Sequence, residues 1–236
     1  MAVAMALVLC SVAACGESVE AGAVNSKGRN PSANSTVQNP WTEADLNRVA
    51  LTDRDGYEVA GRAPQSPDAS DRTAEPAECS PIVQTLGQSS SAYPANARIN
   101  RIFSAKGAGS GTVMNLASHS SGDAERVVQE FRTAAAKCTA FKDIGQSFDY
   151  KDVEVQPDPG YGDESVSLRM AQIVSYPDGE SLKVPYAVVV ARKGATVAMF
   201  YNFNMPLGAN GKKSASIPDD LVKAQLKKIV ALGAAG

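Results

Sequence analysis

Few side chains in this 236-residue sequence have a type and spacing suited to catalysis. The single histidine, His119, stands in Ser118-His119-Ser120-Ser121, and a serine next to a histidine is a pairing used in nucleophilic catalysis. Neighbouring residues seldom present their side chains to one another, however, and the sequence has no Gly-x-Ser-x-Gly turn. We therefore expect a polar turn that leads into a helix, and we assign no catalytic residue.

Two loops have compositions that could bind phosphate or a metal ion, but we expect neither to do so. The glycine-rich segment 107–111 offers backbone N–H groups, yet a phosphate loop opens a helix and this segment leads into a strand pattern. Asp158, Asp163 and Glu164 flank another glycine-rich segment, but their spacing does not match an EF-hand. Isolated thiols and one histidine also lack the number and spacing of a zinc site. We predict no metal and no cofactor.

Cys15 has the surroundings that predict the most specific chemistry. It follows Val12-Ala13-Ala14 and an uncharged, mainly apolar stretch that begins at Met1, and this arrangement resembles the signal of bacterial lipoproteins. The apolar run is too short to span a bilayer and has the length of a cleaved signal peptide. The resemblance implies removal of residues 1–14, acylation of Cys15 with chains such as palmitate, and anchoring on the extracytoplasmic side of the cell membrane. A buried N-terminal helix is the alternative interpretation.

The composition changes after this signal. Residues 15–40 are rich in Gly, Ser, Asn and Pro, so they cannot bury enough apolar area to offset the entropy of ordering, and they predict a flexible stalk. Residues 41–236 have the length and composition of one domain. The formal net charge of −2 and the lack of a basic patch predict no nucleic-acid partner.

Cysteine usage agrees with export. The predicted domain, residues 41–236, contains two cysteines, Cys79 and Cys138. Two cysteines in an exported domain most often pair, so we predict one disulfide between them. Two separate buried thiols are the alternative.

Helices and strands are grouped along the sequence. Capping residues and apolar periodicity predict helices over 42–55, 79–86, 123–138 and 218–232. Alternating patterns and turn residues predict strands over 57–59, 97–105, 111–118, 153–155, 166–175, 184–191 and 195–204. The last three strands are expected to form an antiparallel meander. The fold class is therefore α+β, with an antiparallel sheet packed by helices on one face and stapled by one disulfide.

The strand over 195–204 carries the candidate ligand-binding residues. Met199, Tyr201 and Phe203 alternate onto one face, where methionine and aromatic side chains could line a pocket for an apolar or lipid-like molecule. The Tyr201 hydroxyl could then orient the ligand. Plain core packing under a helix is the alternative use of this face.

The two cysteine positions and the helix pattern resemble a known family. Pro76-Ala77-Glu78-Cys79, a strand near Phe103 and a helix that ends in Ala134-Ala135-Ala136-Lys137-Cys138 resemble exported sensor-type domains of actinobacteria. These occur as lipoproteins and as extracellular domains of mycobacterial serine/threonine kinases. The resemblance covers about residues 42–236 and implies an α+β fold with a central cleft and a role in ligand sensing.

We therefore expect a non-enzymatic binding or sensing lipoprotein at the cell surface. Its expected partners are the membrane, through the N-terminal lipid, and an apolar or lipid-like small molecule or an envelope protein. A cell-envelope hydrolase and a structural partner-binding module are the alternative functions.

Overall fold

The computed structural model of this protein describes residues 40–62, 72–87, 90–104, 111–177, 179–205 and 214–233. The predicted signal peptide, Cys15 and almost all of the predicted stalk lie outside the described residues, as does most of the glycine-rich segment 107–111.

The described strands form one nine-stranded sheet in which neighbouring strands are antiparallel. Its order is β1-β3-β4-β9-β8-β7-β6-β5-β2. In chain order the strands are β1 (Val59–Gly61), β2 (Ala74–Glu75), β3 (Ala97–Ser104), β4 (Gly111–Ser118), β5 (Phe141–Asp143), β6 (Phe148–Gln156), β7 (Glu164–Ser175), β8 (Ser181–Lys193) and β9 (Thr196–Phe203). The predicted meander over the last three strands is confirmed, and it extends back through β6 and β5.

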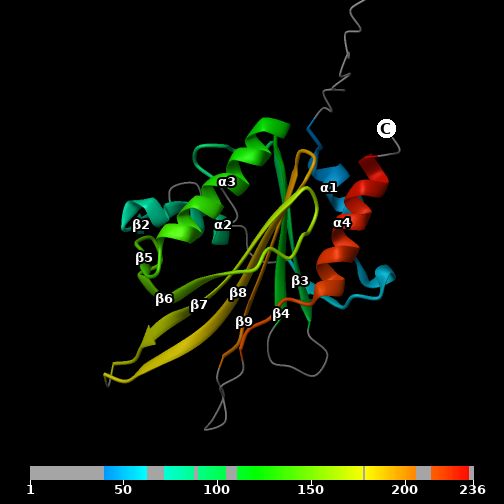
Figure 1. Ribbon diagram of the computed structural model, residues 1–236. Coiled ribbons are helices and arrows are strands. Elements are labelled where there is room, and N and C mark those ends of the chain that lie inside the picture. The colour runs from blue at the N-terminus through cyan, green and yellow to red at the C-terminus, as the bar shows by residue number, and fades with distance from the viewer. Residues whose placement is uncertain are drawn as a thin grey trace, which may run out of the picture. The chain divides into compact units, whose positions relative to one another are not determined.

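The sheet is covered by helices on both faces, so the prediction of helices on one face was wrong. Helices α2 (Ser80–Leu86) and α3 (Ser121–Lys137) pack on one face, and α1 (Glu43–Val49) and α4 (Asp219–Gly233) pack on the other (Figure 1). Two cores result: the first core lies between the sheet and α2 and α3, and the second core lies between the sheet and α1 and α4. Along β8, Val188 and Val190 belong to the first core and Val189 belongs to the second. A strand that is apolar on both sides needs cover on both sides.

The first helix starts where the sequence predicts and ends earlier. Thr42 and Asp45 form a reciprocal cap, in which each side chain accepts a hydrogen bond from the backbone N–H of the other. The helix ends at Val49 because the buried amide of Gln225 on α4 takes over its hydrogen bonds. That amide donates to Val49 O (2.8 Å) and accepts from Leu51 N (2.9 Å).

Cys79 and Cys138 form the predicted disulfide. Their Cα atoms lie 5.9 Å apart, and the bridge joins the turn before α2 to the end of α3. The bond therefore fixes the two helices that cover one face of the sheet. Within the described residues, no helix is long and apolar enough to cross a membrane.

Removing this disulfide should destabilise the domain. Changing both Cys79 and Cys138 to serine should lower the free energy of unfolding by up to about 4 kcal/mol, because the bridge closes a loop with a sequence separation of 59 residues. Urea unfolding measures the change, and the wild type reduced with dithiothreitol is the matched control. Equal unfolding midpoints for oxidised, reduced and doubly substituted protein would contradict the prediction.

Candidate functional site

A cavity of about 460 Å³ lies on the α3 face of the sheet. Strands β3, β4 and β9 contribute to its lining, together with α3, the end of α2 and the segment that leads into β3. This volume is within the usual range for sites that bind small molecules.

Two rows of paired residues lie along the floor of the cavity. Across β3, β4 and β9, the register places Asn100, Asn115 and Met199 side by side in the first row, of which Asn115 and Met199 line the cavity. The second row consists of Arg98, Ala117 and Val197. The floor is therefore polar on its β3 side and apolar on its β9 side.

The same strands contribute core residues on their other face. Met114 and Leu116 alternate with the floor residues of β4 and are fully buried against the α1 and α4 side. A slip of one residue would turn the core side chains of β4 toward the cavity and its floor side chains toward the core. The register of β4 is therefore fixed by packing on the face away from the cavity.

His119 follows the last residue of β4 and lies at one end of the cavity. It is only 3% exposed, and its backbone N–H donates to Ala195 O (2.9 Å). Its Nδ1 atom has no hydrogen-bond partner among the described residues, so Nε2 makes the bonds of the ring to the backbone at Tyr93 and Pro94.

The protonation state of His119 follows from this environment. Burial lowers the pKa of His119 below its ordinary value, an effect that Asp123 and the backbone hydrogen bonds only partly offset. The ring is therefore neutral at pH 7, with its proton on Nε2. Nδ1 therefore carries the lone pair, and it is enclosed by the protein without a hydrogen-bond partner among the described residues.

Asn115 is a second buried polar residue without its full set of partners. It is 5% exposed, and its Nδ2 atom has no hydrogen-bond partner among the described residues. An unsatisfied buried donor costs about 1–3 kcal/mol, which is why folded proteins seldom keep one without a use for it. Asn115 and His119 both line the cavity, but these two unpaired atoms are enclosed by the protein.

Polar contacts hold the segment before β3 at the rim of the cavity. The Tyr93 hydroxyl donates to Glu130 on α3 (3.2 Å), and the guanidinium carbon of Arg126 lies 5.8 Å from the Tyr93 ring centre. Gln84 on α2 donates to the Ser91 hydroxyl (3.0 Å). These contacts link the rim to both helices that cover this face.

The structure separates the three predicted ligand-binding residues. Met199 lines the cavity, whereas Tyr201 and Phe203 are absent from its lining. Tyr201 packs against the first core, and the Phe203 ring stacks on Tyr186 with centroids 5.4 Å apart. A role for Tyr201 or Phe203 in ligand binding stays a prediction.

The sequence pattern around His119 was partly informative. Ser120 caps α3 as expected, and the Ser118 hydroxyl accepts a hydrogen bond from Trp41 N (2.7 Å). Neither pattern nor spacing indicated that His119 itself is buried in a cavity wall. Asn115 gave one usable signal, because it is a polar residue inside an otherwise apolar stretch of strand, Val113 to Ala117.

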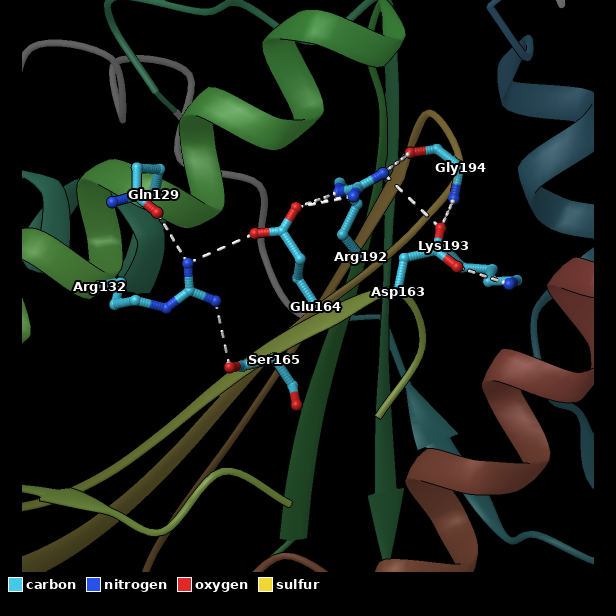
Figure 2. Close-up of polar contacts among 8 residues, drawn as sticks. All are labelled: Gln129, Arg132, Asp163, Glu164, Ser165, Arg192, Lys193 and Gly194. Atoms are coloured by element: carbon cyan, nitrogen blue, oxygen red, sulfur yellow. Dashed lines mark hydrogen bonds and ion pairs between the residues drawn. The ribbon is translucent and has the colours of Figure 1, made fainter. Parts of the chain in front are cut away.

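Two of the three acidic residues considered for calcium, Asp163 and Glu164, form ion pairs. Figure 2 shows Glu164 between Arg192, at 2.8 Å from its Nε, and Arg132 of α3, at 3.4 Å from its Nη1. Asp163 accepts from Lys193 Nζ (2.6 Å) and Gly194 N (2.7 Å). This network ties α3 to the β7 and β8 strands.

Asp158, the third acidic residue, accepts hydrogen bonds from the Ser165 hydroxyl and Gly160 N. Among the described residues, no group of three or more His, Cys, Asp or Glu side chains has the arrangement of a metal site.

Comparisons with known proteins define the fold. No family model and no curated protein matches the chain. The fold is similar to that of the extracellular domain of PknH from Mycobacterium tuberculosis, with a TM-score of 0.50 and 14% sequence identity over 84% of this chain and 99% of that one. A weaker likeness, with a TM-score of 0.40 and 15% identity, links 80% of this chain to 96% of an uncharacterised Mycobacterium smegmatis protein, an ortholog of Rv0999. The chain thus shares its α+β fold with an extracellular domain.

Burial of His119 predicts a specific pH dependence of stability. Because its pKa is lowered in the folded state, the unfolded chain takes up the proton first as the pH falls below the ordinary value of 6.5. The free energy of unfolding should then decrease, by at most about 1.4 kcal/mol per pH unit for one proton. Urea unfolding between about pH 7.5 and about pH 5.5, above the range in which ordinary carboxylates titrate, measures the effect.

The variant His119→Gln is the matched control for this measurement. It removes the titrating ring, so the free energy of unfolding of the wild type should fall relative to that of the variant as the pH is lowered. Parallel curves for the two proteins would show that His119 has an ordinary pKa and is not buried as described.

Proposed function

We propose that this protein is a ligand-binding, sensing domain on the extracytoplasmic side of the cell membrane. One observation carries the proposal: a cavity of about 460 Å³ lies under α3, with Arg98 on the β3 side of its floor and Val197 and Met199 on the β9 side. A partly apolar cavity of this size with a few polar groups is typical of sites that bind small molecules.

The surroundings of His119 favour binding over hydrolysis. A nucleophilic serine must lie within hydrogen-bond reach of its base, and His119 Nδ1 has no hydrogen-bond partner among the described residues. The Ser90 hydroxyl, at the cavity rim, accepts from Tyr93 N (3.2 Å), and the Ser120 hydroxyl donates to Asp123 (2.7 Å). We therefore place no catalytic step at this histidine.

The location is inferred from the N-terminal sequence. Cys15 and the small residues before it support a lipid anchor, and the disulfide is suited to an oxidising space. The fold shared with the extracellular domain of PknH is in keeping with that location. On this proposal the acylated Cys15 holds the domain at the membrane, and the cavity meets its ligand outside the cytoplasm.

Filling the cavity should abolish ligand binding and leave the fold intact. Ala117 lies half-buried on the cavity floor, so Ala117→Phe places a ring in open space and should change the melting temperature by only a few degrees. Wild-type protein equilibrated with a solvent extract of the cell envelope should retain a small molecule that mass spectrometry detects. Ala117→Phe should retain at least about tenfold less of it, which corresponds to a loss of about 1.4 kcal/mol.

The control is Val155→Phe, which adds the same bulk at a residue that is 48% exposed and absent from the cavity lining. It should retain the molecule at the wild-type level. Equal retention by Ala117→Phe and wild type, or no retained molecule in either, would overturn the proposed function.

Cys15→Ser should prevent lipidation. Cells fed an alkyne analogue of palmitate should label the wild type and not the variant, and the variant should be released or left uncleaved. Cys10→Ser is the matched control, because Cys10 precedes the predicted cleavage site and should not affect labelling. Unlabelled wild-type protein in the soluble fraction would show that there is no lipid anchor.

A further inference from the structure

Residues 90–96, here called the rim segment, form one side of the cavity and contribute little to the folded core. The segment has no helix or strand, and none of its side chains belongs to either core. Its residues that line the cavity are Ser90, Ser91, Pro94 and Ala95. A segment with so little buried apolar area can open at a low free energy while the rest of the domain stays folded.

His119 connects the rim segment to the end of β4. Its ring donates through Nε2 to the backbone at Tyr93 and Pro94. Beside it, the backbone carbonyl of Ser118 accepts a hydrogen bond from Asn96 N (2.7 Å). The contacts with α2 and α3 described above add to this attachment. The closed position of the rim segment therefore depends on a histidine that is 3% exposed.

A proton on Nδ1 of His119 is incompatible with this closed arrangement. The imidazolium form has two N–H donors, and Nδ1 is enclosed by the protein without a hydrogen-bond partner among the described residues. A buried charge whose donor is unpaired is costly. When the rim segment moves away from the ring, water reaches Nδ1 and can accept its hydrogen bond. The protonated ring therefore favours an open rim segment.

The charged groups around His119 do not compensate a proton at Nδ1. From α3, Asp123 acts on the ring, but its carboxylate pairs with Arg126 (3.5 Å). Glu130, also on α3, accepts from the Tyr93 hydroxyl, and desolvation raises the pKa of Tyr93 further, so that hydroxyl stays neutral. Arg98 of β3 lines the same cavity and has a partner of its own, and the facing part of β9, residues 195–197, is uncharged.

We infer that the rim segment is an acid-sensitive flap over the cavity, held closed by neutral His119 and released when that ring is protonated. While the segment is open, Nδ1 takes up a proton from solvent, and the charged ring then opposes closure. In the open state the cavity lacks the wall that Ser90, Ser91, Pro94 and Ala95 supply. The inference goes beyond the proposed function, because it concerns when the cavity is closed rather than what it binds.

The direction of the pH effect follows from proton linkage. Burial lowers the pKa of His119 in the closed state, whereas in the open state the hydrated ring has the ordinary value of 6.5. The open state therefore binds the proton first as the pH falls. The ratio of open to closed protein should rise by at most about tenfold per pH unit below that value. Ordinary carboxylates and guanidinium groups do not titrate between about pH 7.5 and about pH 5.5.

Amide hydrogen exchange of the purified wild-type protein tests the inference without a ligand. The reporter is the Asn96 N–H, whose bond to Ser118 O breaks when the rim segment opens. After correction for the intrinsic exchange rate, its protection factor should fall by up to about tenfold between about pH 6.5 and about pH 5.5. Low urea concentrations should leave its exchange unchanged and accelerate that of the buried Val189 N–H, because only global unfolding exposes a large surface.

Two variants assign the effect to its residue. His119→Gln keeps a side-chain N–H donor and does not titrate, so the protection factor of Asn96 should be independent of pH. Tyr93→Phe removes the contact with Glu130 and leaves His119 in place, so protection should be lower at every pH and keep its pH dependence. Thermal melts establish that each variant is folded, and His119→Asn replaces His119→Gln where it is not.

Three results would overturn the inference. The first is a protection factor of Asn96 that is the same at both pH values in the wild type. The second is a pH dependence that persists in His119→Gln. The third is exchange of Asn96 with the same urea dependence as Val189, which would mean that the rim segment opens only when the whole domain unfolds. None of these measurements uses a ligand, so their failure is distinct from failure to retain a molecule from the envelope extract.

Discussion

The pairing of β4 with β9 is the constraint on which the rest of the structure depends. It joins a hairpin from the first half of the domain to the meander of the second half, with a register that runs from Thr112–Asn202 to Ser118–Thr196. The Asn202 side chain donates to Gly111 O (3.0 Å) at one end of this pairing. A slip of one residue would turn Met114 and Leu116 out of their core and remove Asn115 from the cavity floor. The core on one face and the cavity on the other are thus two results of the same register.

Local patterns in the sequence predicted most of the elements, because caps, turns and alternation act between near neighbours. The pairing of Cys79 with Cys138 was predicted from the number of cysteines in an exported domain. Local patterns did not predict which strands meet across long separations, such as β4 and β9, although β4 also pairs with its sequence neighbour β3. The second covered face was missed for a related reason. A continuous apolar run such as that in β8 is compatible with one buried face or two until its neighbours are known. His119 was missed because burial, rather than residue type, determines its properties.

The cavity face is less completely packed than the opposite face. Where Met114 and Leu116 are fully enclosed by apolar side chains, the floor around Ala117 is half-buried and two polar atoms lack partners. Unpaired buried polar atoms cost stability, which contacts elsewhere in the domain must offset. The disulfide fixes α2 to the end of α3, and the ion pairs of Glu164 connect α3 to the strands beneath it (Figure 2). These contacts connect α2, α3 and the strands beneath them.

The nitrogen atoms of His119 provide the most direct measurement of the central claim, that this ring is buried and neutral beside the cavity. The chain has one histidine, so a long-range ¹⁵N–¹H correlation spectrum contains a single ring and needs no assignment. At neutral pH the account predicts a neutral ring with its proton on Nε2. As the pH is lowered from about 7.5 to about 5.5, both ring nitrogen resonances should stay close to their values for the neutral ring, because burial lowers the pKa of His119. A proton on Nδ1, or a ring that titrates with the ordinary pKa of an imidazole, would contradict the account.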